Sequence, residues 1–135
     1  SIIGAPWIDE KFSEKFNNSK ISGTEIIFKS FKPISIKGKS ENPKHLDAFC
    51  NGIILNITNR DSFQPIKTAL KAIMLAKEIY PLDLIINETN MKNLWGNGDI
   101  FDYLNGKISE KQIKKILDQG IEKFKEQRQP FLLYN

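Results

Sequence analysis

The segment of residues 49–65 constrains the fold most, because the spacing of its apolar residues changes from that of a strand to that of a helix. Residues 52–58 are mostly β-branched, and their alternation suits a strand with at least one buried face. After Pro65 the apolar residues recur at helical spacing. They are Ile66, Ala69, Leu70, Ile73, Met74 and Tyr80. We therefore expect a strand followed directly by a helix.

Between that strand and that helix lies a charged corner, formed by Arg60 and Asp61. Side chains that carry function often occupy such corners, because a rigid scaffold holds the loop in place. The side chain of Asp61 or Ser62 is expected to cap the first turn of the helix. Asp61 is therefore interpreted as a helix cap rather than as an acid catalyst, and Arg60 as the better functional candidate.

Three further helices are predicted from capping residues and apolar spacing, over residues 9–17, 99–104 and 109–129. In the first, Phe12 and Phe16 share one face. In the last, Ser109 and Gln112 fit a capping box, and one apolar stripe is expected to pack on the sheet. The stripe consists of Ile113, Ile116, Leu117, Ile121 and Phe124. Gly120 lies on the same stripe, which indicates close backbone packing there.

The remaining segments predict strands and loops. Residues 24–31 form a second strand, and the polar, basic residues 35–46 form a long connection. Residues 87–98 are rich in Asn and Gly and are expected to be irregular, and residues 82–86 are compatible with a strand or an extended loop. The apolar run 131–134 is expected to dock as a closing strand. Together these elements predict an α+β fold, a small mixed sheet with three to four packed helices in a single domain.

Composition excludes several classes of protein. The chain has 135 residues, which suits one compact domain, and no apolar run approaches the roughly 20 residues of a membrane helix. No signal-peptide pattern is visible at the start of the sequence as given. Cys50 is the only cysteine and lies in an apolar strand, so it is expected to be a packed core residue. His45 is the only histidine and is interpreted as a solvated loop residue, so we expect no metal and no cofactor.

The net charge of +4 is concentrated in one stretch. Residues 20–44 contain six lysines and two glutamates, so this stretch accounts for the whole excess of positive charge. A solvated, lysine-rich loop explains this pattern. Binding of nucleic acid would require aromatic residues on a basic sheet face or a reading helix, and neither is evident, so we expect no nucleic-acid partner.

Seven short motifs occur in a fixed order along nearly the whole chain. They are Gly4-Ala5-Pro6-Trp7-Ile8, Phe31-Lys32-Pro33, Cys50-Asn51-Gly52, Thr58-Asn59-Arg60 with Phe63-x-Pro65, Tyr80-Pro81, Phe101-Asp102-x-Leu104-x-Gly106, and the segment Phe124 to Tyr134 with Arg128 and Leu132-Leu133-Tyr134. In this order the motifs resemble the C-terminal part of the exo-β-N-acetylmuramidase family, the NamZ-type glycoside hydrolases formerly catalogued as a domain of unknown function. The chain departs from the family pattern in a short segment between Gly106 and Ser109 and in Leu117, where an aromatic residue is common.

The resemblance implies an accessory role for residues 1–135. Members of the family have an N-terminal Rossmann-like domain that carries the catalytic carboxylates, and a smaller C-terminal domain that helps to form the substrate cleft. The resemblance therefore places no catalytic residue in this chain, and the fragment alone is expected to be inactive. The acidic residues of segment 110–126 alternate with lysines, as on a solvated helix face. The resemblance also implies a periplasmic or otherwise extracytoplasmic bacterial protein whose partner is a sugar derived from peptidoglycan.

Three residues are the candidates for substrate binding, Arg60, Asn51 and Trp95. N-acetylmuramic acid carries a lactyl carboxylate, and a planar guanidinium can hold a carboxylate through two parallel hydrogen bonds. Arg60 could instead form a salt bridge with Asp61. Trp95 could stack on a sugar ring, whereas Trp7 is expected to be buried beside Pro6. A second interpretation of the chain remains open, a non-catalytic module that binds a carbohydrate or a protein on its own.

Overall fold

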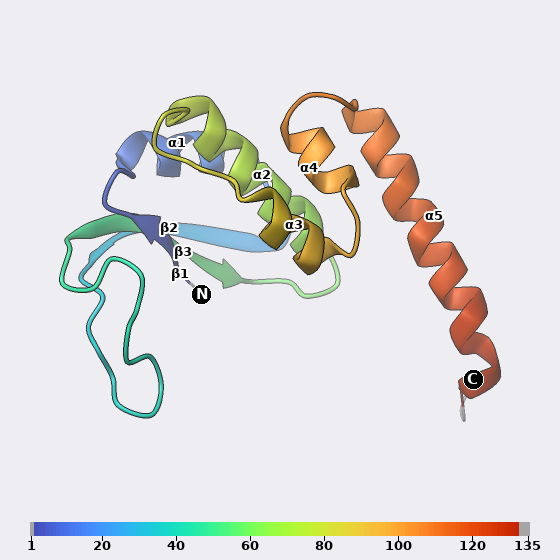
Figure 1. Ribbon diagram of the computed structural model, residues 1–135, viewed down its shortest axis with the longest axis horizontal. Helices are drawn as coiled ribbons and strands as arrows, with labels where there is room; N and C mark the ends of the chain where they lie inside the picture. The colour runs from blue at the N-terminus through green and yellow to red at the C-terminus, as the bar shows by residue number, and fades with distance from the viewer. Residues whose placement is uncertain (1, 133–135) are drawn as a thin grey trace. The chain divides into compact units, whose positions relative to one another are not determined.

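A computed structural model of the protein describes residues 2–132, and its contacts divide the chain into two compact units, residues 1–85 and 86–135. The first unit contains β1 (Ile2–Ala5), α1 (Glu10–Asn18), β2 (Thr24–Phe31), β3 (Cys50–Ile57) and α2 (Pro65–Ile79). The second contains α3 (Glu88–Trp95), α4 (Asp99–Leu104), α5 (Glu110–Arg128) and the short 3-10 helix η1 (Gln129–Phe131). Figure 1 shows these elements along the chain. None of the helices in residues 2–132 is long and apolar enough to cross a membrane.

The sheet of the first unit has the strand order β1-β3-β2, and both pairs of neighbours are antiparallel. The α+β class is confirmed, but the expectation of a mixed sheet is wrong for the described strands. The strand β1 was not predicted, because its four residues include Gly4 and Ala5 and show no clear alternation. The helices also number five within the described residues rather than three or four, because α3 forms where irregular structure was expected.

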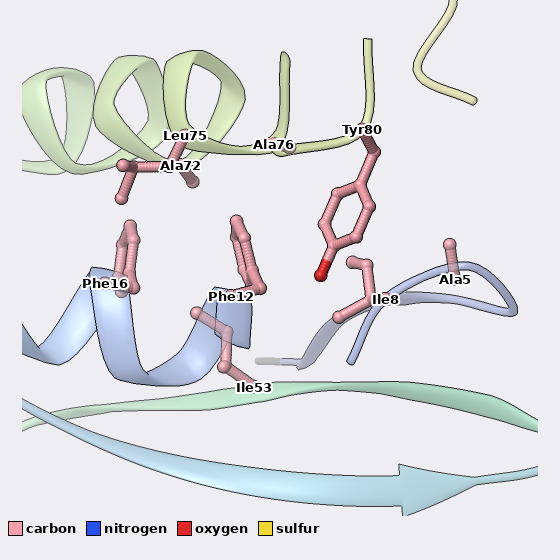
Figure 2. Packing of buried hydrophobic residues seen from close by; sticks show 9 residues of the cluster. All are labelled: Ala5, Ile8, Phe12, Phe16, Ile53, Ala72, Leu75, Ala76 and Tyr80. Carbon is pink, nitrogen blue, oxygen red and sulfur yellow. The ribbon is translucent and has the colours of Figure 1, made fainter. Parts of the chain in front are cut away.

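One apolar core joins the sheet to the helices α1 and α2. Phe12 and Phe16 of α1 point toward α2, which contributes Ala72, Leu75 and Ala76, and Ile53 of β3 points up from the sheet into the same core (Figure 2). The rings of Phe12 and Phe16 are 5.8 Å apart and nearly parallel, as their spacing on one helix face predicts. Cys50 is buried, as predicted, and its thiol donates to the carbonyl of Ala48.

Asp9 and Tyr80 connect the start of α1 to the end of α2. The hydroxyl of Tyr80 donates to Oδ1 of Asp9 at 2.5 Å and accepts the backbone N–H of Asp9 at 3.1 Å. The ring of Trp7 packs against Tyr80 with a centroid distance of 5.2 Å. Asp9 therefore occupies the N-cap position of α1 but makes no side-chain cap to the helix, because its carboxylate binds Tyr80 instead.

The second unit corrects the prediction for residues 87–98. Asn87 caps α3 by accepting the N–H of Asn90 at 2.8 Å, and Gly96 ends the helix with a φ of 79°. Asn87 and Gly96, two of the residues that suggested a loop, are thus the two ends of a helix. Residues 81–86 form a turn and an extended loop rather than a strand.

Helix α5 begins with the predicted capping box. Ser109 accepts the N–H of Gln112, and the side chain of Gln112 accepts the N–H of Ser109 at 2.8 Å. Its apolar stripe is buried only at the N-terminal end, at Ile113, whereas Phe124 is 61% exposed. The prediction that the whole stripe is buried is therefore wrong, as is that of close packing at Gly120, where an added Cβ would meet no described atom within 4 Å.

The expected closing strand falls partly outside the described residues. Phe131 ends the 3-10 helix η1 and Leu132 follows it in an extended conformation. Leu133 and Tyr134 lie outside the described residues. Phe131 itself is therefore helical rather than part of a strand.

The Asp9–Tyr80 contact predicts a pH dependence of stability. Burial, followed by the hydrogen bond to Asp9, raises the pKa of Tyr80 from 10.0 to about 12. The protonated hydroxyl thus stabilises the fold fully below pH 10, and this stabilisation is lost as the pH rises through about 12. We expect Tyr80→Phe to lower the free energy of unfolding at pH 8 by about 1 kcal/mol, the scale of a hydrogen bond.

The difference between wild type and Tyr80→Phe should then shrink between pH 10 and pH 12, when both are followed by denaturant unfolding. Subtracting the two curves removes the contribution of the lysines, which both proteins share. A difference that stays constant across this range would contradict the assignment.

Candidate functional site

The corner between β3 and α2 is organised by Asn59. Its side-chain oxygen accepts the N–H of Asp61 at 3.0 Å and the N–H of Ser62 at 3.1 Å, which forms an Asx turn. Helix α2 then begins at Pro65, with Gln64 at the N-cap position and no side-chain cap. The prediction that Asp61 or Ser62 caps α2 is therefore wrong. Asn59 binds these residues on the strand side of the corner, and proline at the first helical position needs no partner for an N–H.

Gly23, in the turn before β2, also holds the corner between β3 and α2 in place. Its carbonyl accepts the N–H of Thr58 at 2.9 Å and that of Asn59 at 3.3 Å. Its φ is +71°, and a Cβ at this position would lie 2.3 Å from the carbonyl oxygen of Asn59. Only glycine fits such a close approach in the left-handed region. The backbone that carries Arg60 is therefore held by both β3 and the turn before β2.

Arg60 is exposed, at the position that the sequence predicted. The alternative salt bridge with Asp61 is not found: within residues 2–132 no ion pair or hydrogen bond engages the guanidinium. A guanidinium on a fixed corner, with its donors unused by those residues, has the geometry needed to receive a carboxylate from a ligand.

Asn51 lies at the opposite end of β3. Its amide nitrogen donates to the carbonyl of Ile8 at 3.1 Å, and its oxygen accepts the hydroxyl of Ser30 at 2.8 Å. These bonds connect the turn after β1 to the other two strands. At about 3.3 Å per residue, a strand from position 51 to position 57 spans roughly 20 Å, so Asn51 and Arg60 do not share a site.

Trp95 belongs to the second unit, where it forms the last turn of α3 rather than part of an exposed loop. The side chain is half-buried, and within the described residues its indole N–H is buried without a hydrogen-bond partner. Trp7, expected to be buried, is likewise half-buried, against Tyr80.

A partly open apolar cavity of about 470 Å³ lies in the first unit. Its walls include Trp7, Phe31 and Pro33, together with Ala69, Ala72 and Ile73 of α2. Lys44 and His45 supply charged or polar groups, and no carboxylate lines it. His45 lies in the loop, as predicted, but it is half-buried rather than solvated. Sequence reasoning missed the cavity because its lining comes from segments that are far apart in the chain.

Several acidic residues within the described part of the chain are exposed or paired with lysines. A glycosidase normally needs two carboxyl groups about 5 to 10 Å apart in a sugar-sized cleft. The carboxylates of α5 are exposed, and Glu122 pairs with Lys125 at 2.8 Å. Asp61 is exposed, and Asp102 pairs with Lys107 at 2.9 Å. Within residues 2–132 no group of three or more His, Cys, Asp or Glu side chains is arranged to hold a metal ion.

Comparison with known proteins identifies the family. The model of the family described as "Exo-beta-N-acetylmuramidase NamZ, C-terminal" matches residues 1–134. The chain belongs to this family. It is 28% identical over 135 residues to the peptidoglycan β-N-acetylmuramidase NamZ of Bacillus subtilis strain 168, and the match covers 98% of the chain and 31% of that protein.

A solved structure shares the fold. The crystal structure of a DUF1343 family protein from Bacteroides fragilis NCTC 9343 superposes with a TM-score of 0.79, at 15% identity, over 99% of the chain and 35% of that protein. The chain thus spans about a third of the length of both relatives. The resemblance inferred from the seven motifs is confirmed.

The contacts of Asn51 predict a structural role for its side chain. Asn51→Ala should lower the free energy of unfolding by roughly 1 to 3 kcal/mol, because it leaves the partly buried carbonyl of Ile8 without its donor. Asn56→Ala, on the same strand, is the matched control, since Asn56 is exposed and its hydrogen bond to Glu25 is long at 3.5 Å. Equal changes for the two variants in denaturant melts would contradict this role.

Proposed function

We propose that the chain is the substrate-cleft and docking domain of a peptidoglycan-degrading exo-β-N-acetylmuramidase that releases terminal N-acetylmuramic acid. The observation that carries the proposal is the family match over residues 1–134. The named relative is a peptidoglycan β-N-acetylmuramidase about three times as long as the chain, and it shares this segment.

The catalytic carboxylates, in this proposal, lie in a preceding Rossmann-like domain of the same polypeptide. Two observations support this division: the chain covers only 31% of its relative, and the acidic residues described here are exposed or paired with lysines. Peptidoglycan lies outside the cytoplasmic membrane, so we place the protein in an extracytoplasmic compartment.

Arg60 is the proposed contact to substrate. The lactyl carboxylate of N-acetylmuramic acid distinguishes this sugar from N-acetylglucosamine. Arg60 offers a planar guanidinium that no residue within 2–132 engages, on a corner held by hydrogen bonds. Asn51 is a weaker candidate because its amide already makes two hydrogen bonds within the fold. Trp95 is also proposed to stack on a sugar ring. Its indole N–H lacks a partner among the described residues.

The alternative, a binding module that acts alone, would be favoured by a pocket with aromatic walls at Arg60. The described cavity has aromatic walls at Trp7 and Phe31, but Arg60 does not line it. We therefore keep the muramidase domain as the proposed function.

The division of roles predicts where activity resides. Residues 1–135 alone should not hydrolyse a chromogenic N-acetylmuramide, whereas the polypeptide that includes the preceding domain should do so. Purified samples of both, assayed at equal concentration, test this. Comparable turnover by residues 1–135 alone would show that the chain carries its own catalytic pair.

The proposed role of Arg60 predicts that its substitution causes a loss of activity that is selective for N-acetylmuramides. In the polypeptide that includes the preceding domain, Arg60→Ala should lower kcat/KM for an N-acetylmuramide. The loss should correspond to roughly 1.5 to 3 kcal/mol of transition-state binding, the scale of a hydrogen bond to a charged group. Arg60→Lys should restore it only in part, because an ammonium keeps the charge but loses the planar fork.

Two controls separate binding from general effects. Lys67→Ala removes another exposed positive charge near the start of α2 and should leave the kinetics unchanged. An N-acetylglucosaminide lacks the lactyl group, so any hydrolysis of it should be insensitive to Arg60→Ala. If Arg60→Ala leaves the muramide kinetics intact but lowers the melting temperature by several degrees, Arg60 is structural.

A further inference from the structure

The two faces of the three-stranded sheet differ in what covers them. Helices α1 and α2 lie over one face, and Ile53 of β3 points into the core between them (Figures 1 and 2). Successive side chains of a strand point to opposite faces. Ile54 therefore points away from α1 and α2, toward the other face of the sheet.

On that other face, three isoleucines form a row across the whole width of the sheet. Ile54 lies directly opposite Ile2 of β1 and directly opposite Ile27 of β2, so the three side chains share one face. Ile2 and Ile27 are each 44% exposed. A solvated face of an antiparallel sheet normally carries polar side chains at alternate positions, so this isoleucine row is unusual for a surface in contact with water.

The same face continues as an apolar surface beside the row. Gly4 and Gly52 pair next to Ile2 and Ile54, and a Cβ on Gly4 would lie 2.5 Å from the ring of Phe31. The aromatic ring thus lies over the glycine backbone. Glu25 and Lys29 flank Ile27 at the alternate positions of β2, and both are exposed. A flat apolar strip with charged residues at its rim resembles the core and rim of a protein interface.

Part of the connection between β2 and β3, residues 32–49, extends away from α1 and α2 (Figure 1). It carries several exposed apolar side chains, of which Phe49 is 82% exposed. The others are Ile34, Ile36 and Leu46. Loops usually present polar side chains to water, so these exposed apolar side chains are unusual as well.

We propose that the isoleucine row is the surface on which the domain preceding residue 1 docks, a proposal that rests on the proposed function. The matching family describes a C-terminal region, and the relatives are about three times as long as the chain, so most of such a polypeptide precedes β1. Strand β1 begins at Ile2, which is itself a member of the row. The preceding polypeptide therefore joins the chain at the strand that carries one end of the row. Its docking surface should be apolar at the centre, with charges opposite to those of Glu25 and Lys29 at the rim.

Thiol labelling tests which face is covered. Ile27→Cys places a cysteine on the isoleucine row, at a position that is 44% exposed. Met74→Cys places one on α2, on the other side of the sheet, at a position of similar exposure, 39%. Each variant is made in the polypeptide that includes the preceding domain and is labelled under native conditions. Cys50 is buried and reacts slowly in both, so it supplies a common background. We expect the cysteine at position 27 to react at least tenfold more slowly than that at position 74.

Two other labelling results would overturn the proposal. Equal labelling rates at the two positions would mean that the row faces water. Protection at position 27 that disappears on dilution would assign the surface to a second copy of the chain. If Ile27→Cys fails to fold, Ile2→Cys probes the same row at the same exposure. Labelling involves no sugar, so protection of the row without turnover of an N-acetylmuramide would refute the proposed function and leave the docking surface standing.

Discussion

The burial of Ile53 is the constraint on which the first unit depends. Ile53 of the central strand is fully buried and packs in one cluster with Phe12 and Phe16. Because side chains alternate along a strand, a shift of one residue would exchange the two faces of the sheet. With Ile53 in the core, Asn51 must also point to the helix side, where it reaches the carbonyl of Ile8. Ile54 must then point to the other side, opposite Ile2 and Ile27.

At the corner that carries Arg60 the backbone is fixed by hydrogen bonds, whereas no residue within 2–132 binds the side chain of Arg60. Asn59 and Gly23 hold the backbone through four hydrogen bonds, two to the side chain of Asn59 and two to the carbonyl of Gly23. Arg60 itself takes part in none of them. A residue whose position is fixed by its neighbours can change in identity without moving the corner, so the side chain is available for recognition. Asn51 is the opposite case, since its side chain is part of the framework.

Local patterns predicted the elements whose signal lies in a few neighbouring residues. Strand β2 was predicted with its observed ends, and α4 and the capping box of α5 were also correct. Helix α3 was missed because Asn and Gly signal a loop and a helix terminus equally well, and only the hydrogen bond from Asn90 to Asn87 distinguishes them.

Non-local features were beyond the sequence alone. The spacing of apolar residues in α5 showed which side of the helix is apolar. It could not show that no described residue buries Phe124. The position of Arg60 on a strand-to-helix corner could be predicted from periodicity. The hydrogen bonds of Asn51 join residues 21 and 43 positions away, and the cavity has walls from several segments, so neither has a local signature.

Acid catalysis of glycoside cleavage makes a demand on a carboxyl group that Glu78 does not meet. A glycosidase needs one carboxyl group that stays protonated near neutral pH, which requires burial or a neighbouring negative charge to raise its pKa. Glu78 shows the opposite shift, because its hydrogen bond and ion pair with Lys15, at 2.6 Å, lower the pKa of the carboxyl group.

The same pattern of carboxylate and lysine recurs at Asp102 and Glu122. At Glu78 the neighbouring lysine favours the ionised form, and an ionised carboxylate cannot donate a proton to a leaving group. An unpaired guanidinium requires no such tuning, since arginine stays charged at any working pH. Glu78 and Arg60 thus differ in chemistry: the carboxyl group of Glu78 is held in its ionised form by Lys15, whereas the guanidinium of Arg60 is engaged by no residue within 2–132.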